Sequence, residues 1–302
     1  MIVYDIQNLF KTYPRQIQPA NKNISLQIYQ GEIFGILGDN GAGKTTLVRQ
    51  MANLVKSDSG TITFFGENIA NSRHLLQINM GYMPQESGAL NNLTVSEALY
   101  FTAHLRGMSK KDATQECEFL LDLWEIKDLR HQPSSRLSGG QRRLLRLATA
   151  MAGSPPVLIL DEPTNDLDPQ RRKLVWDILR RINSEQETTI ILITHDAIEA
   201  EKAIQRVGIM HKGELVAVGR PSTLKAKIDR TLRLELFFSP SNPPTLPPGL
   251  TCYPLEPGHW RLLLQWEQVT QTLSNLNLEQ IEDFRLYSAT LEDLYLHYAT
   301  NT

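Results

Sequence analysis

The most constraining feature of the sequence is a glycine-rich stretch at residues 38–46. Its order, glycine, four residues and then Gly-Lys-Thr, is the pattern of a phosphate-binding loop. An apolar run at residues 33–37 precedes it and a helix-forming stretch at residues 46–54 follows. The segment therefore predicts a strand, a loop whose N–H groups surround an anion, and a helix N-terminus at the same point. A plain glycine-rich turn is the alternative, and the complete motif with both flanks favours the phosphate loop.

The individual loop residues can be assigned expected roles. Lys44 is expected to reach the β- and γ-phosphates of a nucleoside triphosphate, and the Thr45 hydroxyl is expected to ligate Mg²⁺. The residues expected to hold the nucleotide are Gly38, Asp39, Asn40, Gly41, Ala42, Gly43, Lys44, Thr45 and Thr46.

A second signal is an apolar run at residues 157–160 that ends in two acids, Asp161 and Glu162. An all-apolar strand is typical of a parallel sheet buried on both faces, and ligands bind at the carboxyl ends of such strands. Asp161 is expected to hold Mg²⁺, through water, and Glu162 to accept a proton from an attacking water. The alternative is that the two acids merely begin a loop. The presence of a phosphate loop in the same chain makes that alternative weak.

Two further residues are ambiguous when taken alone. His195 follows another buried strand, residues 189–194, and leaves the sheet at the same edge as Asp161. A lone histidine there is more often structural, and this position adds weight to a functional role. Tyr13 lies in the loop between the first two predicted strands, where an aromatic ring stacks on adenine or simply covers a surface turn. The residue by itself favours the surface turn.

The rest of the chain divides by composition. Residues from about 88 to 153 read as mostly helical, interrupted at residues 137–141, where Ser138 is a plausible N-cap before an arginine-rich helix. An arginine cluster of this kind is usually a solvated face. A predicted hairpin at residues 206–219 closes a first domain, residues 1–226. Residues 227–302 contain a proline-rich connection and predict a small α+β domain without a catalytic motif.

Composition excludes several classes of protein. With 302 residues, the chain is long enough for one large domain or two smaller ones. A net charge of −2 gives no electrostatic basis for binding nucleic acid or an anionic membrane. Cys117 and Cys252 form neither a metal motif nor a disulfide framework. No apolar run approaches the roughly 20 residues that span a bilayer, and no signal peptide is evident, so we expect a cytoplasmic protein.

Taken together, six ordered motifs resemble the ATP-binding subunit of ABC transporters over about residues 1–225. Residues 137–141 match the LSGGQ signature without change, and residues 38–46 and 157–162 match the Walker A and Walker B motifs. Gln85 matches the Q-loop and His195 the switch histidine. Residues 165–168 match the D-loop, with Asn-Asp where many relatives carry glycine or alanine. Tyr13 matches the adenine-stacking aromatic, and this match favours a functional role for that residue.

The resemblance implies an α/β fold of the P-loop NTPase class. Its RecA-like, mostly parallel sheet core is accompanied by an antiparallel β subdomain, an α-helical subdomain at about residues 88–153 and the small α+β C-terminal domain. It also implies a head-to-tail dimer, a homodimer where both half-sites are intact, with two ATP molecules at the interface. Glu162 is then the general base, His195 contacts the γ-phosphate, and Gln85 ligates Mg²⁺. The residues implied to contact nucleotide from the signature and D-loop are Ser138, Gly139, Gly140, Gln141 and Asp168.

The end of the chain, residues 288–296, is similar to the tail of drug-resistance-type exporter ATPases. That similarity implies an exporter subunit on the cytoplasmic face of the membrane, paired with a separate polytopic permease. The alternative is a soluble ABC ATPase that acts on ribosomes or DNA. Against it stand the single cassette, the absence of a coiled-coil insert between Gln85 and Leu137, and the nearly neutral charge. A P-loop kinase or GTPase lacks the signature and the switch histidine.

Overall fold

The computed structural model divides the chain into two compact units, Met1–Gly219 and Arg220–Thr302. It describes residues 1–85, 88, 90–194, 201, 203–228, 231–246, 250–291, 293–294 and 297. The boundary lies before α8 (Pro221–Ile228), so this helix belongs to the second unit, whereas the sequence analysis divided it between two domains.

The first unit contains two sheets. The main sheet has the strand order β10-β9-β3-β8-β7-β6, and the pairs are parallel except for the β9–β10 hairpin. Its strands are β3 (Ile33–Leu37), β6 (Met80–Met83), β7 (Val157–Asp161), β8 (Thr189–Ile193), β9 (Arg206–His211) and β10 (Glu214–Gly219). Every residue of β3, β7 and β8 is buried, as all-apolar strands in a parallel sheet require.

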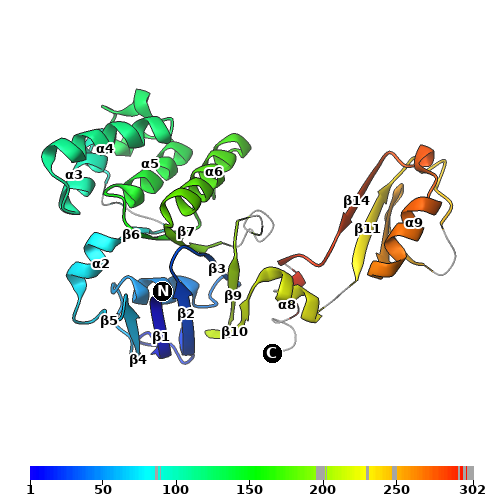
Figure 1. Ribbon diagram of the computed structural model, residues 1–302, viewed down its shortest axis with the longest axis horizontal. Coiled ribbons are helices and arrows are strands. Elements are labelled where there is room, and N and C mark those ends of the chain that lie inside the picture. Colours follow the sequence, from blue (N-terminus) through cyan, green and yellow to red (C-terminus); the bar gives the residue numbers. More distant parts are fainter. Residues whose placement is uncertain are drawn as a thin grey trace. The chain divides into compact units, whose positions relative to one another are not determined.

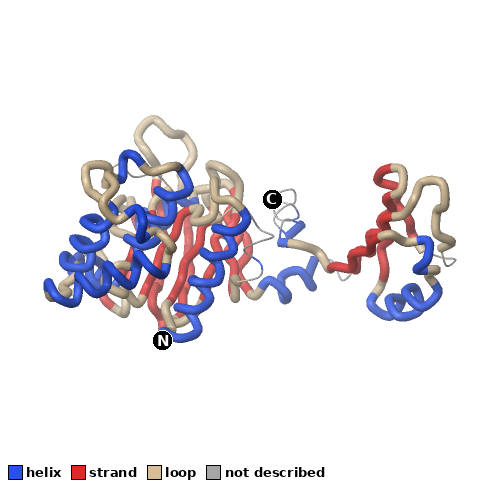
Figure 2. The backbone as a smooth tube through the Cα atoms, turned by 90° about the horizontal axis from the view of Figure 1, so that it is seen from above, coloured by secondary structure: helices blue, strands red, loops and turns tan. Residues whose placement is uncertain are grey.

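The second sheet of this unit is antiparallel, with the order β2-β1-β4-β5. Its strands are β1 (Ile2–Lys11), β2 (Asn21–Tyr29), β4 (Ser59–Phe64) and β5 (Glu67–Asn68). One cluster of buried side chains joins β1, β2 and β4 to β3, β7 and β8 through α1 (Lys44–Met51), which contributes Leu47, Val48 and Met51. The helix that follows the glycine-rich loop is therefore fixed by the core on both sides. Figure 2 shows the strands side by side with helices outside them.

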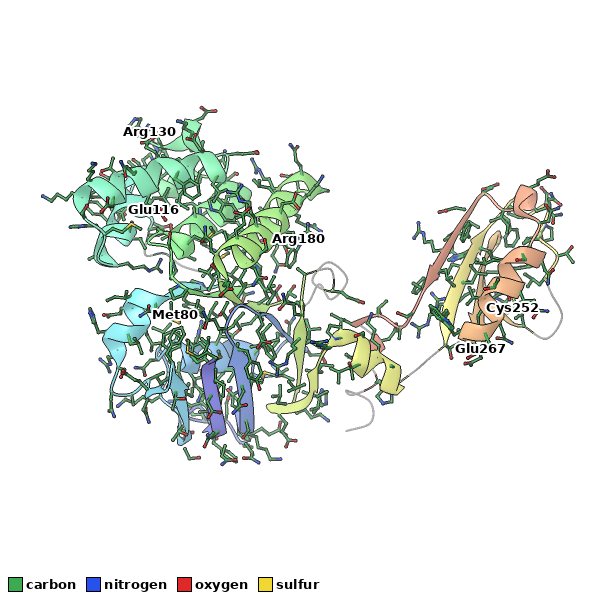
Figure 3. The ribbon with its side chains drawn as sticks, viewed as in Figure 1. Met80, Glu116, Arg130, Arg180, Cys252 and Glu267 are labelled. Carbon is green, nitrogen blue, oxygen red and sulfur yellow. The ribbon has the colours of Figure 1, made fainter. Side chains whose placement is uncertain are left out.

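The helical segment lies on the other side of the main sheet from the antiparallel sheet (Figure 1). Its elements are α3 (Val95–Leu105), α4 (Lys110–Leu123), η1 (Lys127–Leu129), η2 (Ser134–Arg136) and α5 (Gly139–Met151). Arg106, the C-cap of α3, donates to the Ala150 carbonyl at 2.9 Å and to that of Ala152 at the end of α5. Burial lowers the pKa of Arg106 to about 10. A second arginine, Arg130 (Figure 3), makes a bidentate pair with Glu118.

Two further helices lie among the described residues of the first unit, α2 (Arg73–Asn79) and α6 (Pro169–Gln186). The sequence analysis did not predict α2, which ends directly before β6. The helix after the glycine-rich loop begins at Lys44 and ends at Met51. In α6 the proline lies in the first turn, where its missing N–H costs nothing.

Besides α8, the described part of the second unit contains an antiparallel sheet with a short helix packed against it. The sheet order is β12-β13-β11-β14, built from β11 (Leu232–Phe237), β12 (Thr251–Glu256), β13 (His259–Leu264) and β14 (Asp283–Tyr287). The other elements are η3 (Trp266–Gln268), α9 (Val269–Asn275) and η4 (Leu278–Gln280). Alternate leucines of β11 and β13 form its core with side chains of α9. Of the tail at residues 288–296, the structure describes residues 288–291 and 293–294.

We expect the burial of β7 to contribute strongly to the stability of the first unit. Leu158 is 1% exposed and Leu105 is 84% exposed, so the same leucine-to-alanine change compares a buried position with an exposed one. Leu158→Ala leaves a cavity in a packed core and should cost about 2–5 kcal/mol of unfolding free energy. Leu105→Ala should change it by no more than about 0.5 kcal/mol. Denaturant unfolding of the two variants checks this, and equal effects would contradict the assignment of β7 to the core.

Candidate functional site

The first unit contains a cavity of ≈ 1040 Å³ at the carboxyl edge of the main sheet. Its lining comes from the loop after β1, the glycine-rich loop, the ends of β7, β8 and β9, and Gln85, two residues after β6. Of the residues singled out in the sequence, it brings together Tyr13, Asp39, Asn40, Gly41, Ala42, Gly43, Lys44, Thr45, Thr46, Gln85, Asp161 and Glu162. Segments up to 149 residues apart in the chain, from Tyr13 to Glu162, thus converge on one space.

The glycine-rich loop is packed too tightly for side chains at two positions. Gly43 has a φ of 101° and Gly38 a φ of 153°, a region that side chains disfavour. A Cβ atom on Gly43 would lie 2.1 Å from the Ala20 carbonyl oxygen, and one on Gly38 would lie 2.3 Å from that of Met210. The loop is therefore pressed between the β1–β2 loop and the end of β9, which fixes the direction of its N–H groups.

Lys44 opens α1 and is buried under the loop. Its ammonium donates to the carbonyls of Gly38 at 2.6 Å and Asp39 at 2.9 Å. Burial lowers its pKa, and the charges of Glu162 and Asp161 act in the opposite direction. A buried cation held by loop carbonyls beside two acids is suited to binding a polyanion, because phosphate oxygens supply stronger acceptors.

Thr45 and Asp161 meet at the next point of the cavity. The Thr45 hydroxyl donates to Asp161 Oδ2 at 3.3 Å, which joins the start of α1 to the end of β7. Burial raises the pKa of Asp161, the Thr45 hydrogen bond acts to lower it, and the charge of Glu162 raises it further. A hydroxyl and a carboxylate are hard oxygen donors of the kind that Mg²⁺ prefers. No group of three or more acidic, histidine or cysteine side chains suited to a metal occurs among the described residues.

Glu162 is held in an unusual backbone conformation. Its φ is 53°, in the left-handed region, which is uncommon for a residue with a side chain. Its N–H donates to the Ile193 carbonyl at 2.8 Å, and its own carbonyl accepts from Arg143 Nη1 at 2.8 Å. Both sides of the residue are thereby tied to neighbouring elements, and the Glu162 side chain lines the cavity.

Tyr13 also lines the cavity. Its hydroxyl is 3.4 Å from Thr46 Oγ1, and the Lys11 ammonium lies 5.8 Å from its ring centroid. This places an aromatic ring next to the loop in which phosphate binding is expected.

The signature residues lie elsewhere. Ser138 caps α5 in a capping box: its Oγ accepts from the Gln141 N–H at 3.3 Å, and Gln141 Oε1 accepts from the Ser138 N–H at 3.0 Å. Ser138 and Gly139 are exposed, and no residue of the stretch 137–141, all of it described, lines the ≈ 1040 Å³ cavity. Asp168 also serves as a cap, accepting from the Arg171 N–H at 2.9 Å at the start of α6. His195 lies outside the described residues.

Sequence reasoning did not identify Arg143 as a buried residue. The arginine cluster after the signature was interpreted as a solvated face, yet Arg143 is buried and bonded to the Glu162 carbonyl. A signal was present, because Arg143 lies four residues before Leu147 and seven before Ala150, on one buried face of α5. Arg146, one turn after Arg142, donates to the Gln85 carbonyl at 2.9 Å.

The raised pKa of Asp161 leads to a prediction about stability. Because the folded state binds the proton more tightly than the unfolded state, stability falls as pH rises from 3.8 through the raised pKa and stays lowered above it. Asp161→Asn removes this titration and keeps an acceptor for Thr45. In metal-free buffer at pH 7, we expect the variant to unfold at a higher temperature than the wild type. Thermal melts between pH 4 and pH 8 check this: the gain should shrink toward pH 4, and a gain independent of pH would contradict the assigned cause.

Comparison with known proteins identifies the family. Residues 21–165 match the ABC transporter family. The chain is 35% identical over 242 residues to the mouse ATP-binding cassette sub-family A member 17, covering 80% of this chain and 14% of that protein. It is 37% identical over 221 residues to the human phospholipid-transporting ATPase ABCA3, covering 73% of this chain and 13% of that protein. The chain therefore spans only about a seventh of the length of these relatives.

Solved structures share the fold. The structure of cbiO1 from Clostridium perfringens, part of the ABC transporter complex cbiONQ, is 29% identical with a TM-score of 0.66, covering 75% of this chain and 91% of that chain. A dimeric post-hydrolysis state of the ATP-binding cassette MJ0796, bound to ADP and Pi, is 24% identical with a TM-score of 0.67, covering 72% and 98% of the two chains. The first unit has the P-loop NTPase fold expected from the sequence, and the chain belongs to the ABC transporter family, with that unit as its ATP-binding domain.

Proposed function

We propose that this chain is the ATP-hydrolysing subunit of an ABC transporter and powers a separate membrane-spanning partner, most consistently as an exporter. The observation that carries the proposal is the convergence of Lys44, Thr45, Asp161 and Glu162 on one cavity beneath a glycine-rich loop. These four side chains supply the cation, the metal ligands and the base that transfer of a terminal phosphoryl group to water requires.

Nucleotide binding begins with an exchange of acceptors at Lys44. The ammonium leaves the Gly38 and Asp39 carbonyls, or shares them, and donates to the β- and γ-phosphates instead. The N–H groups of residues 41–46 surround the phosphates at the N-terminus of α1, where the helix dipole adds positive potential. Tyr13 stacks on the adenine. Since the triphosphate is negative, it offsets the burial that lowers the pKa of Lys44.

Mg²⁺ fits this cavity through oxygen ligands. Thr45 and Gln85 would ligate it, and Asp161 would hold it through water, with phosphate oxygens as further ligands. When bound, Mg²⁺ neutralises charge that develops on the phosphates. Gln85 follows β6 at the rim of the cavity, a position from which it can report the state of the site to a partner protein.

Hydrolysis is assigned to Glu162 as general base. Its carboxylate takes a proton from the attacking water as the bond to the γ-phosphoryl group forms, and the ADP oxygen leaves with the electrons of the broken bond. His195, which lies outside the described residues, is proposed to contact the γ-phosphate and orient the water.

A second copy of the chain completes the site. The exposed N-terminus of α5, with Ser138, Gly139 and Gly140, can bind an anion through its N–H groups, yet it does not line the cavity of its own chain. The Ser138 oxygen already accepts a hydrogen bond from Gln141, so its hydroxyl hydrogen is available to a phosphate. We place the γ-phosphate of one copy against Ser138 and Gln141 of the other, in a head-to-tail homodimer that separates after hydrolysis.

The transport role is supported by the relatives. One of them is named a phospholipid-transporting ATPase, and cbiO1 is described as part of a transporter complex. None of the helices in the described part of the chain is long and apolar enough to cross a bilayer. We therefore infer a polytopic permease as the partner, with this chain on the cytoplasmic face of the membrane. The second candidate, a soluble ABC ATPase on ribosomes or DNA, has the net charge of −2 against it.

Two variants test the nucleotide chemistry. Glu162→Gln removes the base and should lower kcat for ATP hydrolysis by about 10²–10⁴-fold, because proton transfer is lost. The same variant should accumulate as a dimer with ATP and Mg²⁺. Lys44→Ala removes a charge-assisted contact and should weaken ATP binding by roughly 10–100-fold. Phosphate release, nucleotide titration and light scattering check these outcomes. A Glu162→Gln chain that stays monomeric at saturating ATP and Mg²⁺ contradicts the proposed interface.

The partner is tested by purification from detergent-solubilised membranes. A tagged Glu162→Gln chain, held in the ATP state, should recover a polytopic membrane protein in stoichiometric amount. The matched control is Lys44→Ala, which is not expected to form the dimer. Recovery with ribosomes or DNA and without a membrane protein would overturn the transport role while leaving the ATPase assignment intact.

A further inference from the structure

The buried guanidinium of Arg143 connects two loops at the catalytic end of the main sheet. Arg143 Nη1 donates to the Glu162 carbonyl at 2.8 Å, and Nη2 lies 3.3 Å from Asp166 Oδ2. The Arg143 side chain is 9% exposed, whereas that of Asp166 is 81% exposed. The hydrogen bond to Glu162 is therefore shielded from water, and Asp166 covers the guanidinium on the solvent side. A planar fork with several donors can make both contacts at once.

Both Glu162 and Asp166 have a left-handed backbone conformation, which surrounding contacts must stabilise. Glu162 has a φ of 53° and Asp166 a φ of 60°, and neither is glycine. Conformations of this kind persist only where surrounding contacts determine them. Glu162 is fixed on its amino side by the Ile193 carbonyl and on its carbonyl side by Arg143. The direction in which the Glu162 carboxylate enters the cavity thus depends on Arg143.

The helix that carries Arg143 links this contact to a second one. Arg146, less than one turn further along α5, donates to the Gln85 carbonyl at 2.9 Å. The residues Gln85, Gly139, Arg143, Arg146, Asn165 and Asp166 line a second cavity of ≈ 680 Å³. One face of α5 therefore contacts the residues that follow β6 and β7, while its N-cap Ser138 is exposed.

We propose that Arg143 is a positioning residue for ATP hydrolysis, which holds the Glu162 backbone and the Asp166 loop in the geometry needed for water activation. The proposal rests on the proposed function, because it assigns Glu162 as the base. Arg143 does not line the ≈ 1040 Å³ cavity that Glu162 lines. It acts through the Glu162 carbonyl, and Asp166 orients its guanidinium.

The test is steady-state ATP hydrolysis by the full chain with ATP and Mg²⁺. Arg143→Gln loses the charged fork and should lower kcat by about tenfold or more, with KM for ATP changed by less than about threefold, since binding groups are untouched. Arg143→Lys keeps the charge but not the fork and should retain an intermediate kcat. Asp166→Asn tolerates the left-handed conformation and should lower kcat by about threefold alone. In the Arg143→Gln background it should have no further effect, because the two residues act through one contact.

The control is Arg180→Gln, which removes an ion pair with Asp177 on α6 away from the cavity (Figure 3) and should leave kcat unchanged. A second control separates positioning from assembly: Arg143→Gln in the Glu162→Gln background should still dimerise with ATP. Wild-type kcat in Arg143→Gln, a loss confined to KM, or loss of that dimer would each overturn the proposal. If Arg143→Gln does not fold, the proposal is overturned when Asp166→Asn and Asp166→Gly both have the kcat of the wild type. A wild-type chain without ATPase activity would refute the proposed function instead.

Discussion

The site depends on one buried positive charge, the Lys44 ammonium, held close to two buried carboxylates. Lys44 is bonded to loop carbonyls while Asp161 and Glu162 follow the strand β7. A cation and two acids in a region of low dielectric constant are costly to bury, and a hydrogen-bonded arrangement reduces that cost. The two sheets and α1 provide the arrangement, because one continuous core fixes the start of α1 relative to the end of β7. The cavity for a polyanion is a consequence of this core.

Much of the nucleotide site could be predicted from the sequence because its signals are local. The run from β3 through the glycine-rich loop to α1 is contiguous, and its motif prescribes both the turn and the helix start. The acids after β7 can be predicted as site residues because they directly follow an all-apolar strand. These segments meet because the carboxyl ends of parallel strands share an edge, so the sequence predicts that Lys44 and Asp161 lie close together.

The features that escaped sequence reasoning depend on tertiary partners. Helix α2 is only seven residues long, with one buried side chain, so its sequence shows too little helical periodicity to be predicted. Strand β12 contains Pro254 and lies at an edge of its sheet, where a proline is tolerated but obscures the strand pattern. Arg143 was assigned to a solvated face because a charged side chain defaults to the surface. Its burial reflects acceptors contributed by Glu162 and Asp166, about 20 residues later in the chain.

The second unit has a separate consequence for the history of the chain. Its leucine core is made by β11, β13 and α9, and every residue that lines the ≈ 1040 Å³ cavity lies between Tyr13 and Lys212, in the first unit. Selection on nucleotide chemistry and selection on this C-terminal module therefore act on different sets of residues. A substitution in the C-terminal module therefore changes none of the residues that line the cavity. Sequence variation among relatives should consequently concentrate after Gly219.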